Sequence, residues 1–330
     1  MSESLPASVP TASPSDAARV VDRVVANLDR AVRAPRETLE LCVLGLLAEG
    51  HLIIEDFPGV GKTVLAKSLA RSLHLSFSRL QFTPDLLPTD VTGVNVFSQK
   101  TNEFEFRPGP VFTNVLLVDE INRASPKTQS ALLEAMQENQ VTIDGETYPL
   151  PLPFLVVATQ NPIEYEGTYP LPEAQLDRFL VRIAIGYPSE DAERDILLER
   201  SRRRRERIEL EPICDQQALR AMQAAIEEVH VAPPLAEYAV AIARATRDSP
   251  QLAVGASPRG SLALMKLARA RAAYLGRDFV TPDDIKAVSI PALAHRLTLA
   301  PELWVQRIDP AEAVRAAVAS VAVPVLDELS

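Results

Sequence analysis

The residues with the clearest chemical meaning are Gly61, Lys62 and Thr63, which stand between an apolar run and a helical pattern. The order of strand, glycine-containing loop and helix is the context in which a Gly-Lys-Thr triplet binds phosphate. Backbone N–H groups of such a loop point at anionic oxygens, and the helix N-terminus adds positive partial charge. Lys62 would reach the β- and γ-phosphates, and the Thr63 hydroxyl would bind Mg²⁺. The expected nucleotide contacts in this stretch are Pro58, Gly59, Val60, Gly61, Lys62, Thr63 and Val64.

One position departs from the general phosphate-loop pattern, which has glycine where this chain has Asp56. The alternative to a phosphate-binding loop is an ordinary turn between a strand and a helix. The order of elements around Gly61 favours the phosphate-binding loop.

A carboxylate pair, Asp119 and Glu120, follows a second apolar run at residues 115–118. A continuous apolar run is typical of a strand that is buried on both faces of a parallel sheet. Asp119 at the strand end would hold Mg²⁺ together with Thr63, and Glu120 would polarise the attacking water. The pair alone is a common pattern. Combined with the Gly-Lys-Thr loop, it predicts nucleotide hydrolysis as well as binding.

A third apolar run, residues 154–158, is followed closely by Asn161. Open α/β sheets place their ligands at the carboxyl ends of the strands, which makes Asn161 a candidate site residue. The alternative is that Asn161 is a turn residue before Pro162.

The composition narrows the classes of function. The formal net charge of −10 disfavours binding to nucleic acid or to an anionic membrane. Only 5% of the residues are aromatic, which leaves few platforms on which single-stranded bases could stack. The longest apolar stretch, near residues 41–48, is too short to span a bilayer, and the start lacks a secretory signal. Cys42 and Cys214 are expected to be free thiols in a reducing cytoplasm, so the predicted location is cytoplasmic.

The chain divides into three parts by pattern. Residues 1–16, rich in Ser, Pro and Ala, are expected to form a disordered tail. In residues 17–187 five short apolar runs alternate with helices, which predicts an α/β domain with a doubly wound, five-stranded parallel sheet. Residues 188–330 carry only helical patterns and predict a smaller all-helical domain. The run at 202–205 is interpreted as the basic end of a surface helix and not as a nucleic-acid contact.

Two segments of the first domain stand outside the regular alternation. Residues 83–112 contain four prolines and are expected to be irregular. Asp144-Gly145, between two short strand-like runs, predicts a β-hairpin over residues 141–148. Loops on a rigid scaffold commonly carry function, so residues 95–105 of the first segment and the hairpin 141–148 are candidate partner contacts; the alternative for the hairpin is a purely structural role.

Taken in order, these motifs resemble the MoxR family of AAA+ ATPases, a group of P-loop NTPases. The resemblance covers about residues 17–310, and the Asp56 departure is similar to a variant familiar in that family. The segments that carry it are 55–63, 118–124, 131–138, 158–162, 171–179 and 255–259.

The resemblance implies a role for each candidate residue. Arg178 resembles an arginine finger that reaches the nucleotide of a neighbouring subunit; the alternative is a surface ion pair with Asp177 or Glu173. Arg259 resembles sensor 2 on the lid domain, and whether it serves its own nucleotide or the neighbour's is open. Arg123 is either an interface contact or a helix cap. The remaining roles are Walker A for Lys62 and Thr63, Walker B for Asp119 and Glu120, and sensor 1 for Asn161.

The resemblance also implies ATP and Mg²⁺ as ligands and a homo-oligomer, a hexameric ring, as the working assembly. Residues 83–112 would be the helix-2 insert and 141–148 the pre-sensor-1 hairpin, both facing the pore. Similar proteins mature or activate partner complexes, often von Willebrand factor A domain proteins and metal-dependent enzymes. Two other functions compete: a nucleic-acid translocase of the same clade, and a nucleotide-gated scaffold without hydrolysis. The acidic charge argues against the first, and Glu120 with Arg178 argues against the second.

Overall fold

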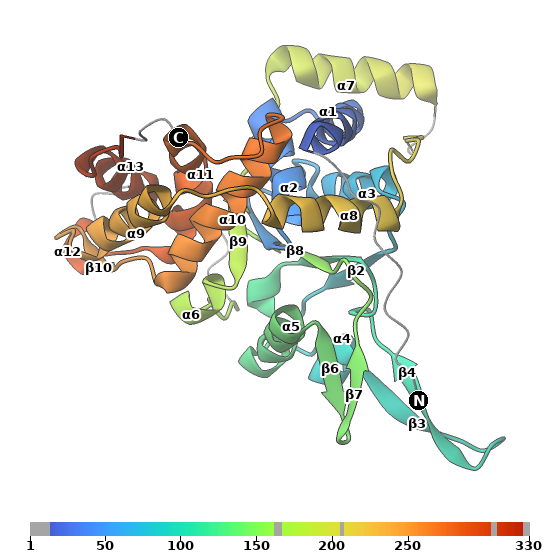
Figure 1. Cartoon of the computed structure of the whole chain (residues 1–330). Coiled ribbons are helices and arrows are strands. Elements are labelled where there is room, and N and C mark those ends of the chain that lie inside the picture. Colours follow the sequence, from blue (N-terminus) through green and yellow to red (C-terminus); the bar gives the residue numbers. More distant parts are fainter. Residues whose placement is uncertain (1–13, 162–166, 205–207, 305–308, 326–330) are drawn as a thin grey trace, which may run out of the picture.

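The computed structural model describes residues 14–161, 167–204, 208–304 and 309–325 (Figure 1). The first helix, α1, begins at Pro14, so the expected tail of residues 1–16 is too long at its end, and residues 1–13 lie outside the described part. The helices α1 (Pro14–Ala31) and α2 (Arg36–Leu47) are separate and lie on either side of Pro35, which is the N-cap of α2.

The central sheet has five parallel strands in the order β2-β5-β8-β1-β9, which confirms the predicted doubly wound α/β architecture. Every residue of β5 is buried, as the continuous apolar run predicts. The strands are β1 (His51–Glu55), β2 (Phe77–Gln81), β5 (Val115–Asp119), β8 (Leu155–Gln160) and β9 (Phe179–Ile183).

Helices cover both faces of the sheet and bury its alternating side chains in two separate cores (Figure 1). Leu52 and Ile54 of β1 pack into one core, whereas Ile53, on the opposite face of the same strand, packs into the other. The first core contains α1, α2 and α3 (Lys62–Ser72), and the second contains α5 (Pro126–Glu138). Between β5 and α5 lies a 3₁₀ turn, Ile121–Arg123, and α6 (Glu173–Leu176) precedes β9.

Residues 83–112 are not irregular, which corrects the sequence prediction. They form a short helix α4 (Pro88–Thr92) and an antiparallel hairpin of β3 (Gly93–Ser98) and β4 (Glu103–Pro108). The second hairpin, β6 (Gln140–Ile143) with β7 (Glu146–Pro149), is confirmed. Its turn residues Asp144 and Gly145 both have positive φ, as a tight hairpin turn requires. Both hairpins project from the same end of the molecule (Figure 1).

The region after β9 is helical, as expected, with one addition. The strands β10 (Leu252–Val254) and β11 (Thr298–Leu299) pair as a small antiparallel ribbon, which helical periodicity could not predict. The basic segment from Arg202 ends α7, with Arg204 as the left-handed cap, as interpreted; Arg205 lies outside the described residues. The helices are α7 (Glu190–Arg203), α8 (Gln216–Glu227), α9 (Pro233–Arg247), α10 (Pro258–Tyr274), α11 (Pro282–Leu293), the 3₁₀ turn Ala294–Arg296, α12 (Pro301–Trp304) and α13 (Pro310–Ser320).

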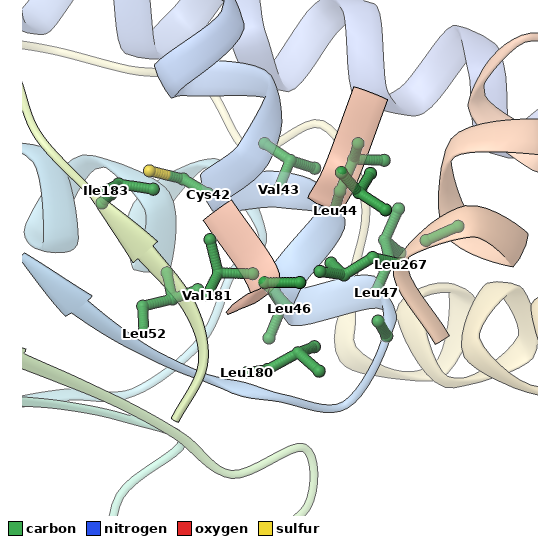
Figure 2. Packing of buried hydrophobic residues seen from close by; sticks show 14 of the residues in the cluster. Cys42, Val43, Leu44, Leu46, Leu47, Leu52, Leu180, Val181, Ile183 and Leu267 are labelled. Atoms are coloured by element: carbon green, nitrogen blue, oxygen red, sulfur yellow. The ribbon is translucent and has the colours of Figure 1, made fainter. Parts of the chain in front are cut away.

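The helical region shares a core with the sheet. In Figure 2, Leu46 and Leu47 of α2 lie between strand residues such as Val181 and Leu267 of α10. Cys42 is buried here, and both Cys42 and Cys214 are free thiols, as predicted. Burial raises the pKa of the Cys42 thiol to about 12. Among the described residues, no helix combines the length and the apolar character that a membrane crossing requires.

Candidate active site

The loop between β1 and α3 has the backbone of a phosphate cradle. Gly59 and Gly61 have φ values of 88° and 98°, in the left-handed region that favours glycine. Gly61 is the N-cap of α3, so the helix N-terminus opens directly onto the loop. The ammonium group of Lys62 donates to the carbonyl oxygen of Gln160 at 3.2 Å and to that of Asp56. Lys62 thereby spans β1 and β8 at the carboxyl end of the sheet.

Asp56 has a structural task that explains why glycine is absent there. Its side chain is buried, and its carboxylate accepts hydrogen bonds from the backbone N–H groups of Phe57 (2.8 Å), Ile185 (2.6 Å) and Gly186 (2.7 Å). The ring of Phe57 stacks on that of Tyr187 with centroids 5.3 Å apart. The phosphate loop is therefore joined to the segment that leads from β9 into the helical region.

Asp119 is held at the end of β5 by two neighbouring strands. Its Oδ2 accepts a hydrogen bond of 2.6 Å from Nε of Arg79 on β2. Its Oδ1 accepts from the hydroxyl of Thr159 on β8 at 3.3 Å, and the same hydroxyl accepts from the N–H of Glu120 at 3.0 Å. Thr159 therefore fixes the relative placement of the two carboxylates.

Glu120 lies in the left-handed region with φ of 56°, which turns its side chain off the strand direction. Its Oε2 accepts hydrogen bonds from Gln81 at 2.8 Å and from Arg123 at 2.9 Å. The expected alternatives for Arg123 were an interface contact and a helix cap, and the structure adds a direct contact with Glu120.

These side chains meet at one cavity of about 350 Å³ at the carboxyl end of the sheet. The hydroxyl of Thr63 and the carboxylate of Asp119 are oxygen donors of the kind that Mg²⁺ binds, so the residues fit this ion. Val60 was expected to contact nucleotide, but its side chain is buried in the core. The lining residues are Pro58, Gly59, Gly61, Lys62, Thr63, Val64, Arg79, Gln81, Asp119, Glu120, Thr159 and Asn161.

Sequence reasoning missed three residues of this cavity. Thr159 precedes Asn161 at the end of an apolar run, and its position beside a candidate site residue was a usable signal. Arg79 and Gln81 lie on β2, a partly exposed strand at the edge of the sheet. No local pattern distinguishes them, because only the pairing of β2 with β5 brings them to Asp119 and Glu120.

Arg178 and Arg259 line a different cavity, of about 400 Å³. Its walls include His51, the first residue of β1, and Leu180 near the start of β9, so it opens at the amino end of the sheet, opposite the phosphate loop. The residues that line the two cavities do not overlap. Three further cations, Arg220, Lys266 and Arg296, line the cavity that holds Arg178 and Arg259.

Arg178 contacts helix α5. Its Nη1 donates to the carbonyl of Leu133 at 3.1 Å and to the side chain of Gln137. Within the described residues it makes no ion pair with Asp177 or Glu173, so the alternative of a surface pair is wrong. Asp177 pairs instead with the buried Arg296.

Comparison with known proteins agrees with this geometry. Residues 51–181 match the ATPase family associated with various cellular activities (AAA), and residues 244–317 match the AAA lid domain. The chain is 48% identical to the uncharacterized protein YeaC of Bacillus subtilis, over 93% of this chain and 95% of that protein. It is 43% identical to the chaperone MoxR1 of Mycobacterium tuberculosis, over 92% of this chain and 82% of that protein. A crystal structure assigned as an ATPase from Cytophaga hutchinsonii has a TM-score of 0.87 at 35% identity and covers 94% of this chain and 97% of its own.

The fold, the phosphate loop with its carboxylates, and the lid define an AAA+ ATPase. Within that class, the chain belongs to the MoxR family and is a chaperone-like ATPase.

Proposed function

We propose that this protein is a Mg²⁺-dependent enzyme that hydrolyses ATP to ADP and phosphate in the cytoplasm, as a hexameric ring that matures or activates partner protein complexes. One observation carries the hydrolytic part: Lys62, Thr63, Asp119, Glu120 and Asn161, from three separate segments, line one cavity at the carboxyl end of the sheet.

Each residue of that cavity has a distinct task. Lys62 and the loop N–H groups bind the β- and γ-phosphates, while Thr63 and Asp119 hold Mg²⁺. When bound there, Mg²⁺ would neutralise charge on the phosphate oxygens. Glu120 orients and polarises the attacking water, and Asn161, directly after β8, assists it. In the structure Glu120 is bonded to Gln81 and Arg123, so these bonds have to rearrange when Glu120 turns to the water.

The second cavity supports a site that is shared between subunits. Arg178 and Arg259 lie at the end of the sheet opposite the phosphate loop, too far along the strands for either to reach its own phosphates without rearrangement. Both cations would instead act on the nucleotide of the adjacent subunit, and Arg259 would thus act in trans. A guanidinium on the transferring phosphoryl group contributes about 10³ to 10⁵ in rate.

The two hairpins are the proposed client contacts. They contact each other where the turn of the second hairpin meets the body of the first: Nδ2 of Asn95 on β3 donates to Asp144 at 2.8 Å. Phe106, which pairs with Asn95 across the first hairpin, stacks on Tyr148 with centroids 4.1 Å apart. Phe97 and Phe104 on β3 and β4 are exposed and form an edge-to-face pair. A linked pair of hairpins that displays aromatic rings suits a protein partner, such as a von Willebrand factor A domain protein or a metal-dependent enzyme.

A phosphate-release assay with and without Mg²⁺ tests the enzymatic part. We expect slow ATP turnover that requires Mg²⁺ and is lost in Lys62→Ala. Nucleotide binding without phosphate release would favour the nucleotide-gated scaffold instead. ATP-stimulated unwinding of a duplex would favour the nucleic-acid translocase.

A further inference from the structure

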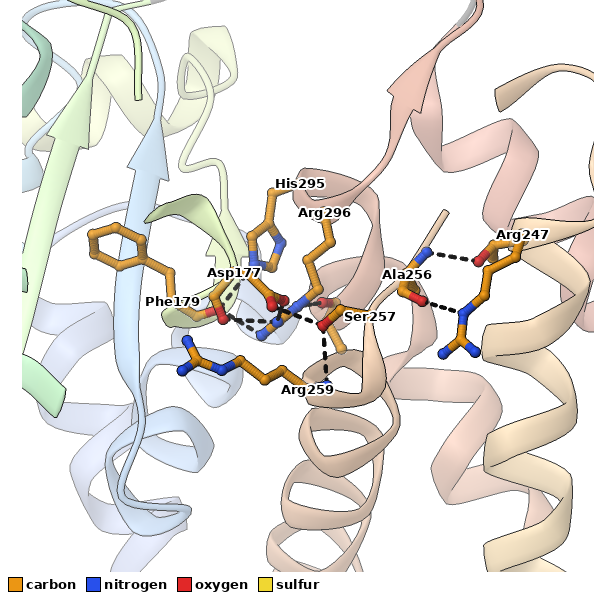
Figure 3. A network of polar contacts seen from close by, with 10 residues as sticks. Asp177, Phe179, Arg247, Ala256, Ser257, Arg259, His295 and Arg296 are labelled. Carbon is orange, nitrogen blue, oxygen red and sulfur yellow. Dashed lines mark hydrogen bonds and ion pairs between the residues drawn. The ribbon is translucent and has the colours of Figure 1, made fainter. Parts of the chain in front are cut away.

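A buried polar network joins the segment that carries Arg178 to the helix that carries Arg259 (Figure 3). Its centre is Asp177, the residue directly before Arg178, and its partners are Arg296 and Ser257 from the lid. Asp177 is on the sheet side of the contact, whereas Arg296 follows α11 and Ser257 precedes α10.

Arg296 is almost completely buried, with 3% of its side chain exposed. Its Nη2 donates to the carbonyl of Phe179 at 2.7 Å, and its Nε donates to that of Ala292 at 2.7 Å. Its Nη1 donates to the carbonyl of Asp177 at 2.8 Å and also pairs with the Asp177 carboxylate. The guanidinium of Arg296 therefore donates to the carbonyl groups of the residues before and after Arg178.

Ser257 extends the network to Arg259. Its hydroxyl donates to Oδ2 of Asp177 at 2.7 Å and accepts from the N–H of Arg259 at 3.0 Å, as the N-cap of α10. His295 adds a contact of 2.9 Å between Nε2 and the carbonyl of Phe179. Arg178 thus directly follows Asp177, the main-chain N–H of Arg259 is bonded to the hydroxyl of Ser257, and Asp177 and Ser257 are bonded to each other.

We propose that Asp177 and Arg296 are positioning residues that hold Arg178 and Arg259 at one fixed spacing, so that both cations meet the same phosphate group of the neighbouring subunit's ATP. The inference rests on the proposed shared site. The guanidinium of Arg259 has no hydrogen bond or ion pair in the described part of the chain, so it is available for an anion.

The alternative is that the pair only docks the lid on the sheet domain. A buried ion pair is weak evidence for stability, because desolvation offsets its attraction. Its placement is the distinguishing feature: the bonds of Asp177 and Arg296 end on the residues that flank Arg178 and on the cap that precedes Arg259. Rigid support around acting groups is what a precise site requires.

Mixed rings distinguish a positioning role from a docking role. Subunits with Arg178→Ala contribute an intact phosphate pocket, and subunits with Lys62→Ala contribute Arg178 and Arg259. Asp177→Asn is then placed in either kind of subunit, and phosphate release is measured after co-assembly. In the cation-donating subunit we expect a loss of about 100-fold, which a misplacement near 1 Å can cause. When Asp177→Asn is in the subunit that contributes the pocket, we expect little change in phosphate release. That subunit already lacks Arg178, so it has no finger for Asp177 to position.

Arg296→Lys is the second variant. It keeps the charge but cannot make all four bonds, so its loss should show the same asymmetry between the two placements. Ser257→Ala is a milder variant because it removes one bond to Asp177. It should give a smaller loss of phosphate release with the same asymmetry between the two placements. It also provides a test if Asp177→Asn subunits fail to assemble. Asp283→Asn, an exposed aspartate of α11, is the matched control and should change nothing in either placement.

Equal losses in both placements, or no loss in either, would overturn the positioning role while leaving the shared site intact. An inactive parental mixture, in rings shown to contain both subunits, would overturn the shared site and this inference with it.

Discussion

The carboxylate of Asp56 accepts a hydrogen bond of 2.7 Å from the backbone N–H of Gly186, which joins the phosphate loop to the start of the segment that leads to the lid. The neighbouring N–H of Ile185 donates to the same oxygen at 2.6 Å. Aspartate therefore replaces the glycine of the general pattern because this fold uses the position as an acceptor. A change in the loop conformation on nucleotide binding would therefore alter these hydrogen bonds, which lie where the segment that leads to the lid begins.

Replacing Asp56 with alanine should destabilise the protein. The N–H groups of Ile185 and Gly186 would lose their acceptor, and each buried N–H left unsatisfied costs about 1–3 kcal/mol. Denaturant unfolding measures the free energy of unfolding. Glu237→Ala, at an exposed position of α9, is the control and should stay close to wild type. Equal stability of Asp56→Ala and wild type would show that these bonds contribute nothing.

Replacing Glu120 with glutamine should separate ATP binding from turnover. The amide keeps the size of the side chain but cannot activate water, so turnover should fall by about 10²- to 10⁴-fold while ATP affinity is retained. Equilibrium binding of a fluorescent ATP analogue and phosphate release measure the two quantities. Equal turnover in Glu120→Gln and wild type would refute the role assigned to this carboxylate.

The hairpin aromatics should matter for clients and not for nucleotide. Phe97→Ser with Phe104→Ser removes two exposed rings, neither of which lines the ATP cavity. We expect the basal ATPase rate to persist and its stimulation by a von Willebrand factor A domain protein to disappear. Val254→Ser, at an exposed apolar position of β10, is the control. Stimulation that survives loss of both rings would place the client contact elsewhere.

The fold should lose stability on mild acidification because of the buried His51. Its Nδ1 accepts from the N–H of Val156 and its Nε2 lies 2.9 Å from the carbonyl of Met136, an arrangement for the neutral ring. Burial, with a smaller contribution from the charge of Lys266, lowers the pKa of His51 from 6.5 to about 4. The folded pKa lies below the unfolded one, so this stability is present above pH 6.5 and is lost as the pH falls toward 4.

The expected loss from His51 between pH 7 and pH 5 is about 2 kcal/mol. His295, whose pKa burial lowers to about 3, acts in the same direction. In His51→Gln the difference in unfolding free energy between the two pH values should shrink by about that amount, whereas the exposed Val254→Ser, which removes no titratable group, should leave it unchanged. An unchanged pH dependence in His51→Gln would contradict this assignment.

The sequence predicts the sheet and the ATP cavity well for a local reason. The apolar runs of β1, β5 and β8, each followed along the chain by Lys62, Asp119 or Asn161, are short-range patterns, and parallel pairing brings their carboxyl ends to one edge. Arg79 and Arg296 could not be predicted, because their roles depend on which distant segments pack beside them. The hairpin of β3 and β4 was missed although β4 carries a signal for it: Glu103 to Arg107 alternate between charged and aromatic residues, as a strand does. The four prolines of residues 83–112 favoured an irregular segment instead.

The central claim is that Arg178 of one subunit completes the ATP site of the next, and mixed assemblies test it most directly. Arg178→Ala subunits and Lys62→Ala subunits should each be nearly inactive alone, since a lost finger costs about 10³ to 10⁵ in rate and a lost phosphate lysine removes the pocket. Phosphate release is measured for each variant alone and for the co-assembled mixture, with mass analysis to confirm mixed rings. The account predicts that the mixture regains activity at interfaces where an intact pocket meets an intact finger. A mixture as inactive as either variant, in rings that contain both, would contradict it.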